Sequence, residues 1–63
     1  MSDQIRLFLA DDHTLVRQGI AALIAAEKGF DLVGQCGHGN EVLDKVHQTR
    51  PDVVVLDISL PGI

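Results

Sequence analysis

Three aspartates occupy positions from which their carboxylates could act together. Asp11 and Asp12 follow an apolar run at residues 5–10, and Asp57 follows a second apolar run at residues 53–56. An ionised carboxylate at the end of a buried strand must be paired or bound to a cation, because a poorly solvated charge is costly. Three such groups suit Mg2+, which prefers oxygen ligands, and a carboxylate can also accept a phosphoryl group. If the two strand ends converge, the sequence predicts a site for both.

The elements that must position these aspartates alternate between strand and helix. Residues 5–10 and 53–56 are almost continuously apolar, which indicates strands of a parallel sheet that is covered on both faces. Residues 30–36 alternate imperfectly and predict a strand with one wetter face. Helices are predicted at residues 14–28 and 40–49, because apolar residues recur there at three- and four-residue steps. The predicted order is β-α-β-α-β.

The first helix is expected to bury one stripe and to carry recognisable caps. Asp12 or Thr14 can cap its start, and Gly29 suits a left-handed stop. The predicted buried stripe comprises Leu15, Val16, Gly19, Ile20, Leu23 and Ile24. The predicted outer face comprises Arg17, Gln18, Ala21, Ala22 and Ala25.

The second helix is expected to turn Val42, Leu43 and Val46 inward. Pro51 should end this helix and favour extended geometry at Arg50.

Connectivity predicts that the aspartates meet. Right-handed crossovers with the two helices on opposite faces place the third strand beside the first, in the sheet order 2-1-3. The carboxyl ends of strands one and three then form a topological switch point, where open α/β sheets bind ligands. Asp11, Asp12 and Asp57 are the residues placed there.

Composition narrows the classes of function. The chain has 63 residues, a net charge of -4 and a single cysteine, Cys36. An acidic segment is not expected to contact nucleic acid, which calls for a basic face. A lone cysteine fits a reducing cytoplasm, and no leader peptide or membrane span is expected.

The same residues carry a family resemblance. The acidic pair after strand one, Asp57 after strand three and the Leu60-Pro61-Gly62 segment resemble the N-terminal half of a receiver domain of two-component response regulators. The run from Asp11 to Gly19 resembles the subgroup whose receivers precede a LuxR-type helix-turn-helix output domain. The resemblance implies a partial flavodoxin-like doubly wound fold and a parent protein that regulates transcription.

This resemblance also implies roles for individual residues. Asp57 would accept a phosphoryl group from the histidine of a sensor kinase, in a Mg2+-dependent reaction. Asp11, Asp12 and Asp57 would hold the Mg2+, with a further ligand from the backbone carbonyl of Ser59. A receiver of this kind is a phosphorelay signalling module in the cytoplasm and is not an enzyme in the usual sense.

One departure from the family pattern concerns the end of the chain. The sequence stops at Ile63, in the loop after the third strand. It lacks the later strands and helices, the switch hydroxyl residue and lysine of the family, and an output domain. We therefore expect residues 1–63 to form an incomplete receiver domain with impaired phosphorylation, which could self-associate through the edge of strand three.

Other interpretations remain open. A Mg2+-dependent phosphohydrolase with an aspartate nucleophile usually needs a second acid two residues later, where this chain has Ser59. A non-catalytic interaction fragment would use the sheet edge alone. His13 could bind a metal or donate a phosphoryl group, although a surface histidine in the first helical turn is the simpler interpretation. His38 and His47 lack partners at zinc spacing and should be exposed.

Overall fold

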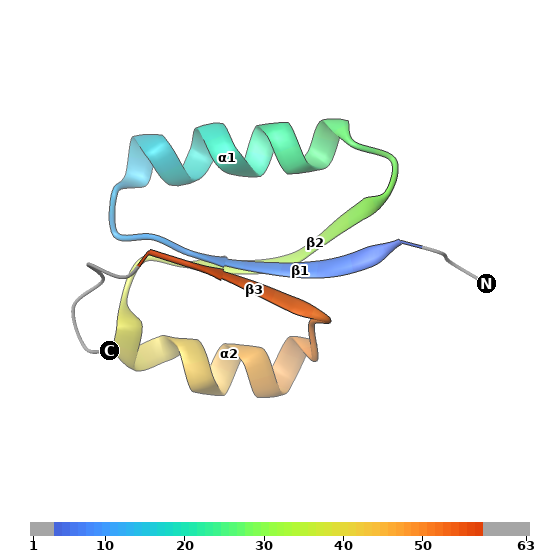
Figure 1. The fold of residues 1–63 in the computed structure, drawn as a ribbon. Helices are drawn as coiled ribbons and strands as arrows, with labels where there is room; N and C mark the ends of the chain where they lie inside the picture. The colour runs from blue at the N-terminus through green and yellow to red at the C-terminus, as the bar shows by residue number, and fades with distance from the viewer. Residues whose placement is uncertain (1–3, 58–63) are drawn as a thin grey trace.

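The computed structural model describes residues 4–57. Its elements, in chain order, are β1 (Ile5–Ala10), α1 (Thr14–Ala26), β2 (Phe30–Cys36), the short 3-10 helix η1 (Gly39–Glu41), α2 (Val42–Thr49) and β3 (Val53–Leu56). The three strands form a parallel sheet in the order β2-β1-β3, with α1 over one face and α2 over the other (Figure 1). This arrangement confirms the predicted order and the truncated flavodoxin-like fold.

The ladders on either side of β1 fix the positions of the strand ends. Ala10 pairs with Cys36 on β2 and with Leu56 on β3. Beyond these pairs, the Asp11 N–H donates to the Cys36 carbonyl at 3.1 Å, and the Asp57 N–H donates to the Ala10 carbonyl at 3.0 Å. The residues after β1 and β3 are therefore held side by side by the backbone itself.

The buried core of the described residues centres on β1. Phe8, Ala10 and Cys36 form a buried cluster against which Val42 and Val46 of α2 pack. Leu7 and Leu9 are also buried, and they face the side of α1 because successive strand residues point to opposite faces. The register between β1 and β2 shifts between Leu7 and Phe8, which leaves one residue of β2 without a partner.

The predicted caps and bounds of α1 are partly wrong. The helix ends at Ala26, and Glu27 follows in extended geometry, so Gly29 is not a left-handed stop. His13 occupies the N-cap position without a side-chain cap bond. The reason lies two residues earlier, because an Asp11 carboxylate oxygen accepts the His13 N–H at 2.8 Å and turns the chain into the helix.

The buried stripe of α1 is narrower than predicted. Ile20 and Ile24 are half-buried, together with Arg17 and Ala21 from the predicted outer face. Leu15 is 83% exposed, and Val16 and Leu23 are exposed as well. A single helix that lies on a sheet buries only the line of its own residues that faces the strands. In the described part of the chain, the apolar residues on either side of that line are therefore exposed to solvent.

Helix α2 ends at Thr49 as predicted, but its start and the geometry of the residue after it differ from the prediction. It begins at Val42, after η1, and Leu43 is exposed because it lies off the line of Val42 and Val46. Arg50 is left-handed, with φ 49° and ψ 61°, where extended geometry was predicted. Its N–H donates to the Val46 carbonyl at 2.8 Å, so the left-handed residue closes the helix before the chain turns back into β3.

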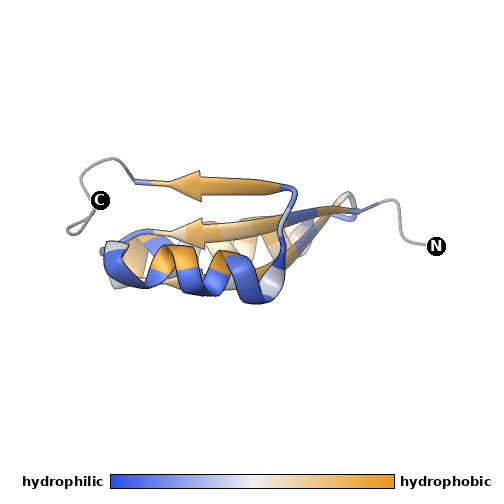
Figure 2. Cartoon of the chain, turned by 90° about the horizontal axis from the view of Figure 1, so that it is seen from below, coloured by the Kyte–Doolittle hydropathy of each residue, from blue (hydrophilic) through white to orange (hydrophobic). Residues whose placement is uncertain are grey.

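Strand β3 lies at the outer edge of the described sheet, as Figure 2 shows. Its four residues are apolar, yet each is 38–45% exposed. No helix within residues 4–57 is long and apolar enough to cross a membrane.

Candidate metal and phosphoryl site

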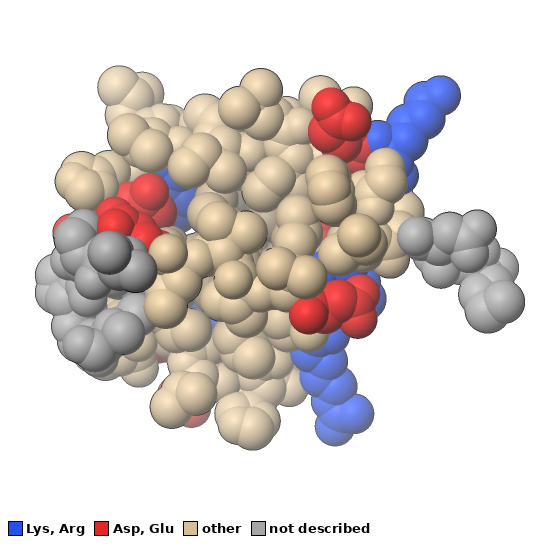
Figure 3. Space-filling model, in the orientation of Figure 1, with Lys and Arg blue, Asp and Glu red and all other residues tan. Residues whose placement is uncertain are grey.

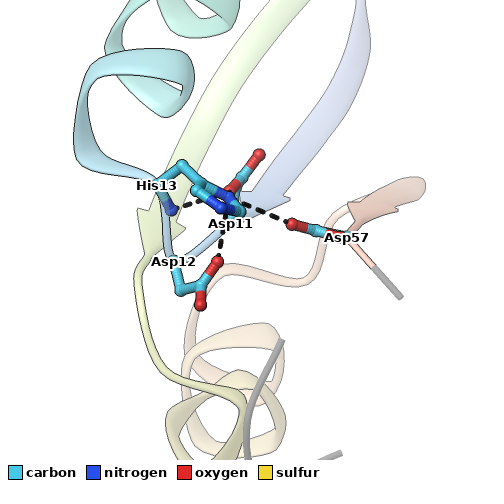
Figure 4. A group of neighbouring side chains, drawn as sticks. All are labelled: Asp11, Asp12, His13 and Asp57. Atoms are coloured by element: carbon cyan, nitrogen blue, oxygen red, sulfur yellow. Dashed lines mark hydrogen bonds and ion pairs between the residues drawn. The ribbon is translucent and has the colours of Figure 1, made fainter. Parts of the chain in front are cut away.

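Four side chains gather where β1 and β3 end (Figure 4). Asp11, Asp12, His13 and Asp57 each offer one ligand atom, and these atoms lie within 4.8 Å of one another. Figure 3 shows acidic side chains at this end of the molecule and further ones at the opposite end, next to Lys and Arg side chains. The convergence of the three aspartates follows from the strand order that the sequence predicts.

Asp11 is the most enclosed member of the cluster. Its side chain is 10% exposed. Its backbone N–H is held by β2, through the bond to Cys36, and its carbonyl accepts from the Arg17 guanidinium at 2.9 Å. One carboxylate oxygen is shared between the His13 N–H and the His13 ring. Asp11 is therefore fixed in both backbone and side chain.

Asp12 and Asp57 face the same space with greater access to solvent. Their side chains are 32% and 22% exposed. Asp57 comes from a different strand and is anchored by its N–H to the Ala10 carbonyl. A reagent that approaches from solvent can therefore reach these two carboxylates more readily than the Asp11 carboxylate.

The His13 ring lies among the three carboxylates. Its Nδ1 is 3.0 Å from an oxygen of Asp11, 3.0 Å from one of Asp12 and 3.4 Å from one of Asp57. The hydrogen bond with Asp11 raises the pKa of His13 most, and the charges of Asp12, Asp11 and Asp57 raise it further. The ring is nevertheless 61% exposed.

The sequence favours a surface histidine in the first helical turn at His13, with a metal ligand or phosphodonor as alternatives, and does not predict these contacts. The adjacency of a basic side chain to the acidic pair was visible in the sequence. The direction of the ring depends on the first turn of α1 and on the Asp11 bond, which the sequence pattern does not specify.

Arg17 also lies differently from its prediction. The sequence predicts Arg17 on the outer face of α1, but its side chain is half-buried and reaches the Asp11 carbonyl. His38 and His47 are exposed, as predicted, and lie outside the cluster. Cys36 is buried in the core with a free thiol.

The donor set fits a small divalent cation. Three carboxylates provide hard oxygen ligands from two strand ends, and they offer negative charge that a cation would neutralise. The imidazole of His13, whose Nδ1 is directed at the same oxygens, already offsets part of this negative charge. Ser59, whose carbonyl was predicted as a further ligand, lies outside the described residues.

Comparisons with known proteins agree with this geometry. Residues 7–63 match the response regulator receiver domain family. The response regulator GacA of Pseudomonas viridiflava is 46% identical over 59 residues, which are 94% of this chain and 28% of that protein. The DNA-binding transcriptional activator DevR/DosR of Mycobacterium tuberculosis is 44% identical over 57 residues, which are 90% of this chain and 26% of that protein.

A solved structure shares the fold. The signal receiver domain of a NarL response regulator from Mycobacterium tuberculosis superposes with a TM-score of 0.90 at 30% identity, over 97% of this chain and 49% of that chain. The chain thus spans less than a third of the length of the curated relatives above and about half of a solved receiver. The match of family, fold and strand order shows that the chain belongs to the receiver domain family of two-component response regulators.

Proposed function

We propose that Asp57 accepts a phosphoryl group from the phosphohistidine of a sensor kinase. A carboxylate oxygen of Asp57 attacks phosphorus, the N–P bond breaks, and the electron pair returns to the kinase imidazole, which takes up a proton. The observation that carries the proposal is the convergence of three carboxylates from two strand ends within 4.8 Å. The family resemblance adds the assignment of the acceptor to the residue after β3.

The neighbours of Asp57 favour it as the acceptor. Asp11 is nearly enclosed, and one of its oxygens already accepts the His13 N–H, so it is poorly placed to meet an incoming phosphoryl group. Asp57 is more accessible than Asp11, and its backbone N–H is bound to the Ala10 carbonyl, which holds its carboxylate in the cluster. A fixed nucleophile needs little reorganisation before it reacts.

Mg2+ belongs to the same proposal. Asp11, Asp12, Asp57 and the Ser59 carbonyl would hold it, and when bound it would offset the negative charge of the nucleophile and of the phosphoryl oxygens. The imidazole of His13 would leave the carboxylates, which its large exposed fraction permits.

The parent protein, on this proposal, relays the signal to transcription. DevR/DosR is named a DNA-binding transcriptional activator, and the relatives extend well beyond the region that matches this chain. Residues 1–63 would then supply the acidic half of a receiver, without contacting nucleic acid. A cytoplasmic location is part of the same proposal and agrees with the free thiol of Cys36.

Phosphoryl transfer from a small donor tests this function. The chain is incubated with acetyl phosphate and Mg2+, reduced with borohydride to convert an aspartyl phosphate into homoserine, and mapped by mass spectrometry. We expect slow labelling at Asp57, because the family's switch hydroxyl and lysine are not among these 63 residues. Fusion to the C-terminal half of the Mycobacterium tuberculosis receiver should accelerate it.

Two variants make the assignment specific. Asp57→Asn should abolish the label in both the chain and the fusion. Asp31→Asn is the matched control. Asp31 lies opposite Arg6 in the ladder between β1 and β2, at the end of the sheet away from the cluster, so its substitution should leave labelling unchanged. Label that persists in Asp57→Asn, or a fusion that takes up none, would refute the proposed acceptor.

A further inference from the structure

Arg17 joins three segments behind the acidic cluster. Its guanidinium Nη1 donates to the Asp11 carbonyl at 2.9 Å, and its Nε donates to the Gln35 side-chain oxygen at 3.2 Å. One side chain on α1 therefore contacts the residue after β1 and a residue of β2. The guanidinium suits this bridge because its donors are held in a rigid plane.

Gly37 leaves the space that the guanidinium occupies. A Cβ at position 37 would lie 2.6 Å from Arg17 Nη1 and 3.7 Å from the Asp11 carbonyl oxygen. A methyl group there would displace the guanidinium, because a Cβ does not approach another heavy atom so closely without a covalent bond. Gly37 thus allows the guanidinium to take its observed position.

The contact determines the direction of the peptide that joins Asp11 to Asp12. The Asp11 N–H donates to the Cys36 carbonyl, which holds the peptide group before Asp11. The hydrogen bond from Arg17 to the Asp11 carbonyl holds the peptide group after it. The next residue along that peptide is Asp12.

We propose that Arg17 is a positioning residue for the metal site, through the Asp11–Asp12 peptide and with Gln35 and Gly37 as its supports. The inference rests on the proposed function, because it requires the cluster to bind Mg2+. Groups that orient metal ligands typically change metal affinity by about 10- to 100-fold when they are removed.

The test is a Mg2+ titration followed by amide NMR signals of the folded chain. Arg17→Lys keeps the charge but cannot bridge both acceptors, and Gly37→Ala displaces the guanidinium without altering it. Each should weaken Mg2+ binding by about tenfold. Gln35→Leu removes only the outer acceptor and should weaken binding less.

Arg6→Lys is the matched control. Arg6 likewise donates to backbone carbonyls, those of Thr49 and Arg50, but at the opposite end of β1. It should lower the midpoint of thermal unfolding as Arg17→Lys does, yet leave Mg2+ affinity unchanged. This difference separates a positioning role from a purely structural one.

The outcomes are distinguishable. If the wild-type chain binds Mg2+ and all three variants bind it equally well, Arg17 does not position the site. If Arg6→Lys weakens binding as much as Arg17→Lys, the effect is one of general stability and the inference is wrong. A wild-type chain that shows no saturable Mg2+ response would overturn the proposed metal site and this inference with it.

Discussion

At the scale of single residues, the imidazole of His13 occupies the space in which a cation would meet the carboxylates. Its Nδ1 lies 3.0–3.4 Å from oxygens of Asp11, Asp12 and Asp57. A bound metal would compete with the ring for the same oxygens. Because the ring is largely exposed, the competition should be modest.

Removal of the ring should therefore strengthen metal binding. We expect His13→Ala to lower the dissociation constant for Mg2+ by roughly threefold, because a solvent-exposed ion pair is weak and competes only modestly with the metal. Isothermal titration calorimetry measures this directly. His47→Ala, on the exposed side of α2, is the control and should bind Mg2+ as the wild type does. Weaker binding in His13→Ala would instead identify the imidazole as a ligand.

The pH dependence follows from the direction of the His13 shift. The pKa is raised above its usual 6.5, so the folded chain gains stability from the imidazolium below pH 6.5 and loses it as the pH rises through the raised pKa. At the lower pH, Mg2+ would have to displace the positively charged imidazolium of His13. At the higher pH, it would displace only the neutral imidazole. Apparent Mg2+ affinity should rise across this interval, and the rise should be smaller in His13→Ala. Titrations at about pH 6 and pH 8 test it.

The sequence predicted which aspartates would meet but not how their neighbours would be arranged. Asp11, Asp12 and Asp57 could be placed together because strand order and the ladder determine where each strand ends. The contacts of His13 and Arg17 depend on side-chain rotamers and on the space above Gly37. These are three-dimensional facts without a periodic signal in the sequence.

At the scale of elements, two glycines differ in what their missing side chain does. A Cβ at Gly34 on β2 would lie 3.0 Å from the ring of Phe8 and 3.3 Å from Thr49 Cγ2. Phe8 is completely buried and cannot move aside freely. A Cβ at Gly19 on α1 would meet nothing within 4 Å. The first glycine admits close packing, whereas the second only weakens its helix.

Substitution by alanine should have opposite effects at these positions. Gly34→Ala should lower the free energy of unfolding by about 1–3 kcal/mol, because it overpacks the core. Gly19→Ala should raise it by about 0.5–1 kcal/mol, because alanine favours the helix. Urea denaturation followed by circular dichroism measures both. Equal effects at the two sites would contradict the packing described for β2.

The element types and their order were predictable, whereas some boundaries and exposures were not. Continuous apolar runs are typical of parallel strands, and both β1 and β3 have the predicted bounds. The end of α1 and the left-handed Arg50 depend on local backbone bonds to Ile24 and Val46. The exposure of Leu15 depends on how many elements cover the helix, and amphipathic spacing alone does not reveal that number.

At the scale of the whole molecule, apolar surface remains open along β3 and on both helices. The β3 side chains are about two-fifths exposed, and Leu15, Leu23 and Leu43 are exposed far more. β3 is bonded to β1 along one edge, and no strand of the described part of the chain lies along its other edge. Open edges of this kind pair with other chains.

We expect the 63-residue chain to self-associate through this edge as its concentration rises. Val54→Lys should reduce the association, because the lysine would be buried at the interface between two sheets. Analytical ultracentrifugation, with circular dichroism to check folding, tests the expectation. Gln48→Lys adds the same single positive charge at an exposed position of α2 and serves as the control. A folded monomer at high concentration would show that the apolar surface is tolerated in solution.

The central proposal is that Asp11, Asp12 and Asp57 form one cation site. Amide NMR during a Mg2+ titration tests it most directly, in the wild-type chain and in Asp12→Asn. We predict saturable shifts concentrated at these three residues and at His13, and at least tenfold weaker binding in Asp12→Asn, as expected for the loss of a charged ligand. Shifts spread evenly over the acidic surface, or an unchanged response in Asp12→Asn, would contradict the site.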